Sequence, residues 1–161
     1  MYRGSQQVTH IKHLGAGVYR EWLADGRVCV MLSTQVGREV TDVWTDAIKK
    51  LLDEADPSKP VYLIYDFSAS RTILTPYNQQ KVMEVASYRP EIVNIMAVII
   101  QKNLFGQIMK AFLDRLRFPH ITVQVFFSRG EGEAWIMEKL AEESTQPSLN
   151  ASKSPTNGDM P

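Results

Sequence analysis

Apolar positions along this chain alternate between the spacing of strands and the spacing of helices. Two short runs, Val18–Leu23 and Arg27–Leu32, flank Ala24-Asp25-Gly26, and an Asp-Gly pair in such a place is a strong signal for a β-hairpin. Val61–Phe67 and Ile92–Ile100 are nearly continuous apolar runs, which are typical of strands buried on both faces. These segments therefore predict a hairpin followed by buried strands.

Segments with helical spacing separate the predicted strands. The first has apolar residues at i, i+3, i+4 and i+7 and ends at Asp56-Pro57, as an amphipathic helix does. Its apolar residues are Val40, Val43, Trp44, Ala47, Ile48, Leu51, Leu52 and Ala55. Thr75-Pro76 predicts an N-cap followed by proline at the first helical position of a second helix.

Two further helix starts carry capping signals. Asn103 can cap a third helix, and Ser128 with Glu131 has capping-box spacing ahead of a fourth. The last predicted strand, Ile121–Phe127, lies between these two helices. The order ββαβαβαβα predicts an α/β domain with a mostly parallel, mixed sheet of five strands and about four helices.

The chain of 161 residues has the length of one domain with extensions. We expect residues 1–15 to form a flexible arm and residues 16–142 to form the folded unit. Residues 143–161 lack aromatic side chains and are rich in Ser, Pro, Asn and Thr. Such a composition buries too little apolar surface to offset the entropy of ordering, so this tail is predicted to be disordered.

Charge and composition exclude several classes of protein. Eighteen basic residues balance eighteen acidic ones, which argues against a nucleic-acid-binding protein. The single cysteine, Cys29, excludes an internal disulfide framework and suits a reducing compartment. No apolar run approaches the roughly 20 residues of a membrane span, and the first residues lack the apolar segment of a secretory signal. We therefore expect a cytoplasmic location.

The motifs of common enzyme classes are missing from the sequence. It contains no phosphate-loop motif, no Gly-x-Gly-x-x-Gly and no Gly-x-Ser-x-Gly. Asp66 has no second acid at a recognisable spacing, and His10 and His13 have no third ligand within reach by sequence. The prediction is a non-enzymatic protein without a metal or cofactor.

The strand Val61–Phe67 (VYLIYDF), the strand Val123–Phe127 and the helical run Glu133–Ile136 together resemble the SpoIIAA-like (STAS/SEC14-like) group of proteins. The resemblance covers about residues 16–142. It implies a STAS-like fold in a bacterial protein and a regulatory role in binding a protein partner. The partner would dock on the loop after the third predicted strand and on the helix that follows.

In phosphorylatable STAS domains, Asp-Ser opens a helix eight or nine residues after the strand that ends in Asp-Leu. Leu74-Thr75 occupies that place here. Thr75 keeps a hydroxyl at the helix start, where a phosphoryl group would meet free backbone N–H groups; alternatively, Thr75 only caps the helix. The candidates for partner docking or phosphorylation are Asp66, Ser68, Ser70, Thr72 and Thr75.

A second hypothesis is a small binding protein for an apolar or anionic, lipid-like ligand. Polar residues after strand ends are candidates for holding an anion, namely Arg71, Lys102, Asn103 and Arg129; alternatively, they are only solvated loop residues. The predicted third helix has an apolar face of Phe105, Ile108, Met109, Phe112 and Leu116. The SEC14-like resemblance implies that such a face could line a ligand site, and the alternative is ordinary core. The exposed edge of the hairpin would also permit a homodimer.

Overall fold

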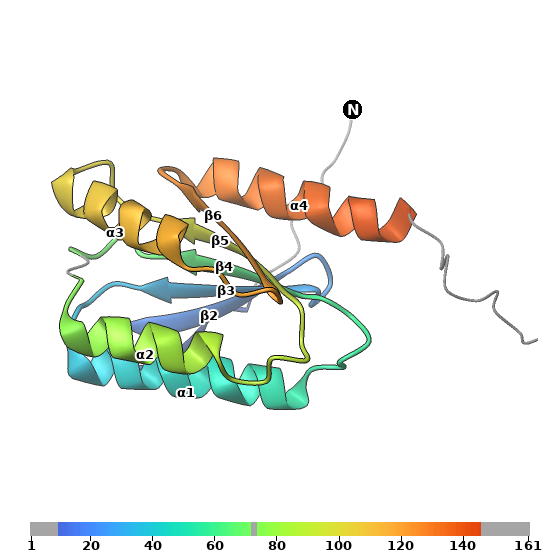
Figure 1. Ribbon diagram of the computed structural model, residues 1–161, viewed down its shortest axis with the longest axis horizontal. Coiled ribbons are helices and arrows are strands. Elements are labelled where there is room, and N and C mark those ends of the chain that lie inside the picture. Colours follow the sequence, from blue (N-terminus) through green and yellow to red (C-terminus); the bar gives the residue numbers. More distant parts are fainter. Residues whose placement is uncertain (1–9, 72–73, 146–161) are drawn as a thin grey trace, which may run out of the picture.

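The computed structural model describes residues 10–71 and 74–145, which form one six-stranded sheet with helices on both faces (Figure 1). The strands are β1 (Lys12–Gly15), β2 (Val18–Leu23), β3 (Val28–Ser33), β4 (Val61–Asp66), β5 (Asn94–Ile99) and β6 (Ile121–Phe126). The helices are α1 (Arg38–Glu54), α2 (Pro76–Ala86), α3 (Leu104–Arg115) and α4 (Arg129–Thr145). The α/β class, the hairpin and the helices predicted from the sequence are confirmed.

The strands lie side by side in chain order. The pairs β1–β2 and β2–β3 are antiparallel, whereas β3, β4, β5 and β6 run parallel. Each parallel connection passes through a helix and advances the sheet by one strand in the same direction. The right-handed crossover rule then puts α1, α2 and α3 on one face.

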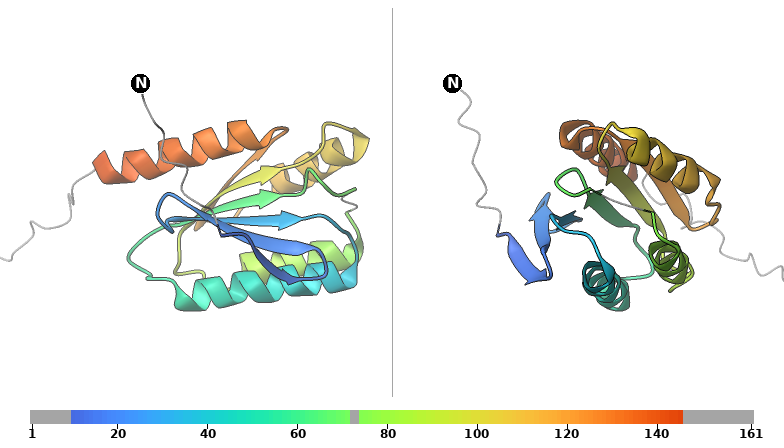
Figure 2. Two further views of the ribbon diagram at one scale, coloured as in Figure 1. Left: turned by 180° about the vertical axis from the view of Figure 1, so that it is seen from behind. Right: turned by 90° about the vertical axis from the view of Figure 1, so that its left-hand side faces the viewer.

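The alternation of side chains along β4 divides the core into two layers. Leu63 and Tyr65 pack with α1, α2 and α3, whereas Tyr62 and Ile64 pack with α4 on the other face. The end-on view in Figure 2 shows α1 and α2 across the sheet from α4. The sheet is therefore covered on both sides, as parallel strands require.

The sheet has six strands and not the predicted five, because residues 12–15 form β1 at its edge. These residues were expected to belong to a flexible arm. Gly15, Ala16 and Gly17 all have positive φ angles and turn the chain from β1 into β2. The ring of His13 packs against that of Tyr19 across the two strands, at 4.8 Å between centroids. As a result, β1 covers the edge of β2 that was predicted from the sequence to be exposed.

The C-terminal boundary of the folded unit, predicted at residue 142, also differs slightly. Helix α4 continues through Thr145, three residues into the segment predicted to be disordered. Its last turns are held to the sheet, since Glu143 accepts hydrogen bonds from Arg27 at 2.9 Å and from Tyr62 at 3.0 Å. Residues 1–9 and 146–161 lie outside the described residues.

All three predicted helix caps are present. The Thr75 hydroxyl accepts a hydrogen bond from the backbone N–H of Asn78, and Pro76 is the first residue of α2. Asn103 caps α3 by accepting from Gly106 N. At the start of α4, the Ser128 hydroxyl accepts from the N–H of Glu131. Each cap satisfies one of the backbone donors that a helix start leaves free.

Helices α1 and α2 form a parallel pair. Two polar contacts join them and a third follows just after the end of α2, all at a constant offset of 35 residues, as expected for parallel helices in register. The contacts are Tyr77 with Asp42, Lys49 with Glu84, and Tyr88 with Asp53. Helix α2 also packs more extensively against α1 than against the strands of the sheet.

Candidate functional site: an apolar cavity beneath α2

Helix α2 packs mainly on α1 and leaves space above the sheet. Only Val85 and Ala86, at its C-terminal end, are buried. Its first two turns carry the polar side chains of Asn78, which lines the cavity, and of Gln79 and Gln80, so this part of the helix supplies few apolar atoms to the interior. A cavity therefore remains beneath α2.

The cavity has a volume of about 130 Å³ and lies between the helices α1, α2 and α3 and the strands β3, β4, β5 and β6. An apolar cavity of about 150 Å³ is large enough to bind benzene. None of the described residues that line it is charged. Prominent among them are Trp44, Leu63, Tyr65, Val82, Met96 and Met109.

Within the described part of the chain, four buried side chains of this cavity have a polar atom without a hydrogen-bond partner. They are Ser33 (Oγ), Trp44 (Nε1), Tyr65 (the hydroxyl) and Asn94 (Oδ1). Their residues are between 2% and 8% exposed. Leaving a buried polar atom unpaired costs about 1–3 kcal/mol each, so these atoms are strong candidates for contact with a bound molecule.

Trp44 and Tyr65 occupy the middle of the cavity. Their rings meet edge to face, with centroids 5.2 Å apart, a favourable arrangement for aromatic pairs. The indole can only donate a hydrogen bond, whereas the phenol can donate or accept. Burial, together with the nearby Cys29 thiol, raises the pKa of Tyr65, so its hydroxyl keeps its proton at neutral pH. The pair thus offers two donors to a hydrogen-bond acceptor.

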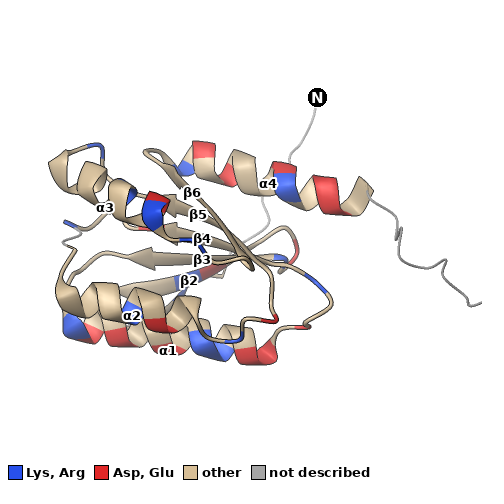
Figure 3. Ribbon diagram, viewed as in Figure 1, with Lys and Arg blue, Asp and Glu red and all other residues tan. Residues whose placement is uncertain are grey.

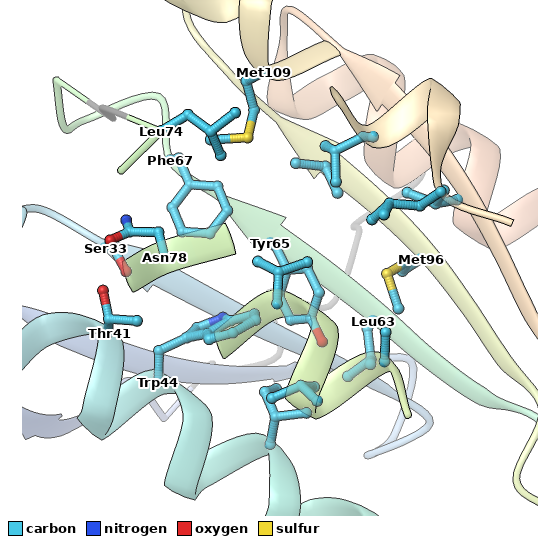
Figure 4. A pocket seen from close by; sticks show the side chains of 18 of the residues that line it. Ser33, Thr41, Trp44, Leu63, Tyr65, Phe67, Leu74, Asn78, Met96 and Met109 are labelled. Carbon is cyan, nitrogen blue, oxygen red and sulfur yellow. The ribbon is translucent and has the colours of Figure 1, made fainter. Parts of the chain in front are cut away.

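Ser33 and Asn94 mark opposite ends of the sheet. Ser33 is the last residue of β3, and Asn94 is the first of β5. The Asn94 amide donates to the carbonyl of Ile92 at 3.1 Å, so its free atom is an acceptor. Figure 4 shows Ser33, Thr41 and Asn78 on one side of the cavity and Leu63 and Met96 on the other. The cavity therefore follows the length of the strands.

This lining defines the chemistry of a suitable ligand. A charged group inside would have no counter-ion among the described lining residues, and burying an unpaired charge is very costly. Apolar walls with a few separated polar atoms are typical of small-molecule sites. The cavity suits a neutral, largely apolar molecule that carries an acceptor such as a carbonyl oxygen.

The loop predicted to dock a partner uses its polar groups internally. Asp66 is 3% exposed, and its carboxylate accepts from the backbone N–H of Ser68 at 2.9 Å and from the Ser68 hydroxyl at 2.5 Å. Ser70 is 4% exposed and donates to the carbonyl of Phe67 at 3.3 Å. Thr75 donates to the Asn78 side chain, and Thr72 lies outside the described residues.

The predicted anion ligands do not line the cavity. Arg129 donates to Glu21 at 2.7 Å and to Glu133 at 2.5 Å, and these two hydrogen bonds raise its pKa against the opposing effect of burial. Asn103 serves as the cap of α3. Lys102 and Arg71 are exposed near the start of α3. Of the predicted anion ligands, only Arg71 and Lys102 therefore have a charged side chain exposed to solvent, as an anion-binding residue requires.

The apolar face predicted for α3 is only partly core. Met109 is buried, at 8% exposure, and lines the cavity. Phe105 and Ile108 are 55% and 48% exposed on the outer side, so their expected place in the core is wrong. Helix α3 is apolar on two sides, and its sequence alone does not show which side meets the sheet.

Sequence reasoning missed Ser33, Trp44, Tyr65 and Asn94 as site residues. A weak signal existed, because Tyr65 and Asn94 place polar atoms inside otherwise apolar strand runs, and buried polar groups ordinarily need partners. The cavity itself had no sequence signal, because it depends on how far α2 stands from the sheet.

Two other properties follow from the described residues. In residues 10–71 and 74–145, no three His, Cys, Asp or Glu side chains are grouped closely enough to hold a metal ion. None of the helices described combines the length and the apolar sequence needed to cross a membrane.

The fold and the cavity define an α/β protein with a covered, mixed sheet and an internal apolar site. Comparisons with known family models, curated proteins and solved structures find no match to this chain. The SpoIIAA-like resemblance thus stays a prediction from sequence, and function has to be inferred from the site.

Proposed function

We propose that this protein binds a small, neutral and largely apolar ligand in the cavity beneath α2. One observation supports the proposal above all: four buried polar atoms without partners line the same uncharged cavity. A ligand acceptor between Trp44 and Tyr65 would satisfy two of them. Such binding requires no catalytic group, in keeping with the non-enzymatic role expected from the sequence.

Methyl benzoate is an example of this chemistry, since it combines a small apolar body with a neutral ester and is of a size that suits a cavity of about 130 Å³. It is the apolar ligand of the sequence hypothesis, restricted to a small, neutral molecule. The SEC14-like resemblance, which implies that some relatives of this shape could hold an apolar ligand, points in the same direction.

Docking of a protein partner on the loop after β4 has less support. Asp66, Ser68 and Thr75 already have hydrogen-bond partners within the loop and the helix cap, and Ser70 is buried. A kinase would reach the Ser70 hydroxyl only after the loop opened.

A neutral fluorescent probe tests the proposed function. We expect 1-naphthylamine, which is small and neutral at pH 7, to bind with enhanced emission. We expect methyl benzoate to displace it at a concentration at least tenfold lower than benzoate does, because benzoate would bring an unpaired charge into the cavity. Equal displacement by the two competitors, or no probe binding, would contradict the proposal.

A matched pair of substitutions locates the bound probe. Ala86 lines the cavity, so Ala86→Leu should fill part of it and weaken probe binding at least tenfold. Ala141 lies exposed on α4, so Ala141→Leu should leave binding unchanged. If both variants bind as the wild type does, the probe occupies another site and the proposal fails.

A further inference from the structure

The outer face of α3 is an unusual apolar surface. Leu104, Phe105 and Ile108 are 71%, 55% and 48% exposed, and the spacing of their positions puts them on one side of the first two turns. The opposite side of α3 is buried against the sheet through Gly106, Met109 and Leu113. A helix that is apolar on both sides is normally covered on both sides, so this outer face is suited to a partner.

The surroundings of this face are basic. Residues 100–118 contain four basic residues and one acid, Asp114, although the whole chain is neutral. Asp114 is paired with Lys110 at 2.6 Å. Lys102 precedes the apolar face and Arg115 follows it, both exposed. Figure 3 shows the first turns of α3 free of charged positions, with charges before it and at its far end. Apolar residues flanked by basic ones match the surface of an anionic lipid layer.

A groove beside this face adjoins the cavity. The groove has a volume of about 420 Å³ and is lined by Arg71, Leu104 and Phe105, among others. Ser70 and Met109 line both the groove and the cavity. Among the residues that the structure describes, only these two line both spaces, and they stand at the border between them.

We propose that α3 docks on an anionic lipid surface, with Leu104, Phe105 and Ile108 inserted among the lipids and Lys102 and Arg71 at the level of the headgroups. Docking in this way turns the groove toward the lipids. The cavity ligand then enters from the lipid layer past Ser70 and Met109. Entry of the ligand rests on the cavity function proposed above, whereas docking of α3 does not.

A lipid surface fits this face better than a protein does. Standard protein interfaces bury about 800 Å² and roughly 20–30 residues on each partner, and three exposed side chains on one helix are far fewer. A lipid layer needs no shape complementarity, and each basic residue near an anionic layer contributes roughly 1 kcal/mol, about fivefold in affinity.

Vesicle flotation with the full chain tests the docking. We expect binding to phosphatidylcholine vesicles containing 30% phosphatidylserine, weaker binding to pure phosphatidylcholine, and loss of binding as salt screens the basic residues. The triple variant Leu104→Gln, Phe105→Gln, Ile108→Gln should bind at least tenfold more weakly. Its fold should be intact, because it changes only exposed side chains, and circular dichroism checks this.

Val93 provides a matched control. It is 44% exposed and precedes β5, at the opposite end of the sheet from the start of α3, so Val93→Gln should bind vesicles as the wild type does. The proposal is overturned if wild-type protein ignores anionic vesicles, or if the triple variant still binds them. It is also overturned if the triple variant instead converts a dimer into a monomer, because the face would then join two copies.

The two proposals fail separately. Probe binding without vesicles reports on the cavity alone, and the triple variant should leave it unchanged. Vesicle binding together with an empty, non-binding cavity would reject the proposed function and keep the docking. Probe binding without vesicle binding would keep the proposed function and reject the docking of α3.

Discussion

Tyr62 and Tyr65 lie on opposite faces of β4, and among the described residues only the hydroxyl of Tyr62 has a hydrogen-bond partner. Tyr62 donates to the Glu143 carboxylate at 3.0 Å, whereas the Tyr65 hydroxyl is buried without a hydrogen bond. The two tyrosines of this strand therefore have different roles. The hydroxyl of Tyr62 holds α4 to the sheet, whereas the hydroxyl of Tyr65 is available inside the cavity.

Removing the two hydroxyls should have opposite effects. Tyr62→Phe breaks a hydrogen bond to a carboxylate and should lower the free energy of unfolding by about 1 kcal/mol. Tyr65→Phe removes an unpaired buried hydroxyl and should leave stability unchanged or raise it by up to about 1 kcal/mol, while weakening the binding of methyl benzoate. Urea unfolding measures both, and a larger loss for Tyr65→Phe would show that its hydroxyl has a partner.

Gly106 is required at its position by the close approach of α3 to the end of β5. A Cβ there would lie 1.9 Å from the backbone oxygen of Gln101, so Gly106→Ala forces the helix start to move and should cost about 1–3 kcal/mol. Gly130, near the start of α4, has open space around its Cα. Gly130→Ala should be neutral or stabilise by up to about 1 kcal/mol. Similar melting temperatures for the two variants would contradict this account.

Thr75 is expected to act as a helix cap. Thr75→Ala removes the acceptor for Asn78 N and should lower stability by about 1 kcal/mol, while Thr75→Ser should retain most of it. Neither change should alter binding of the probe. The phosphorylation hypothesis makes a different prediction, a mass increase of one phosphoryl group on Thr75 in protein isolated from its own host, and peptide mass spectrometry distinguishes the two.

The Cys29 thiol should be unreactive in the folded protein. Burial raises its pKa from 9.0 to about 12, against a smaller effect of Arg20 in the other direction. Almost no thiolate is then present at pH 8, and the side chain is 1% exposed. Ellman's reagent should react only as fast as the protein unfolds, and rapid reaction of the native protein would show that β3 opens locally.

The raised pKa of Cys29 also makes the free energy of unfolding depend on pH. The unfolded chain releases the thiol proton from about pH 9, whereas the folded protein holds it until about pH 12. Stability is therefore complete below pH 9 and falls as pH rises above it. Tyr62, whose pKa burial and Glu143 raise to about 12, adds to this fall from about pH 10. Cys29→Ala should flatten the decrease of melting temperature between pH 9 and 10, and an unchanged slope would exclude the thiol as its cause.

Local signals predicted most secondary structure. The periodicity of α1, the Thr75-Pro76 start of α2 and the Asp25-Gly26 turn depend on residues close in sequence, and the structure contains all three. The strand β1 was missed because four residues next to a Gly-Ala-Gly turn carry almost no pattern. It is held in place by pairing with β2 and by the contact of His13 with Tyr19, which no local pattern records.

The sequence by itself determined the α/β class, the helix caps and the buried strands, since each follows from short-range spacing and capping chemistry. Tertiary structure alone decided which side of α3 faces solvent and where a cavity remains. Helix α2 meets α1 through polar contacts between residues 35 positions apart, and beneath it Trp44 and Tyr65 have polar atoms without a partner among the described residues. Short-range patterns carry no information on such distances.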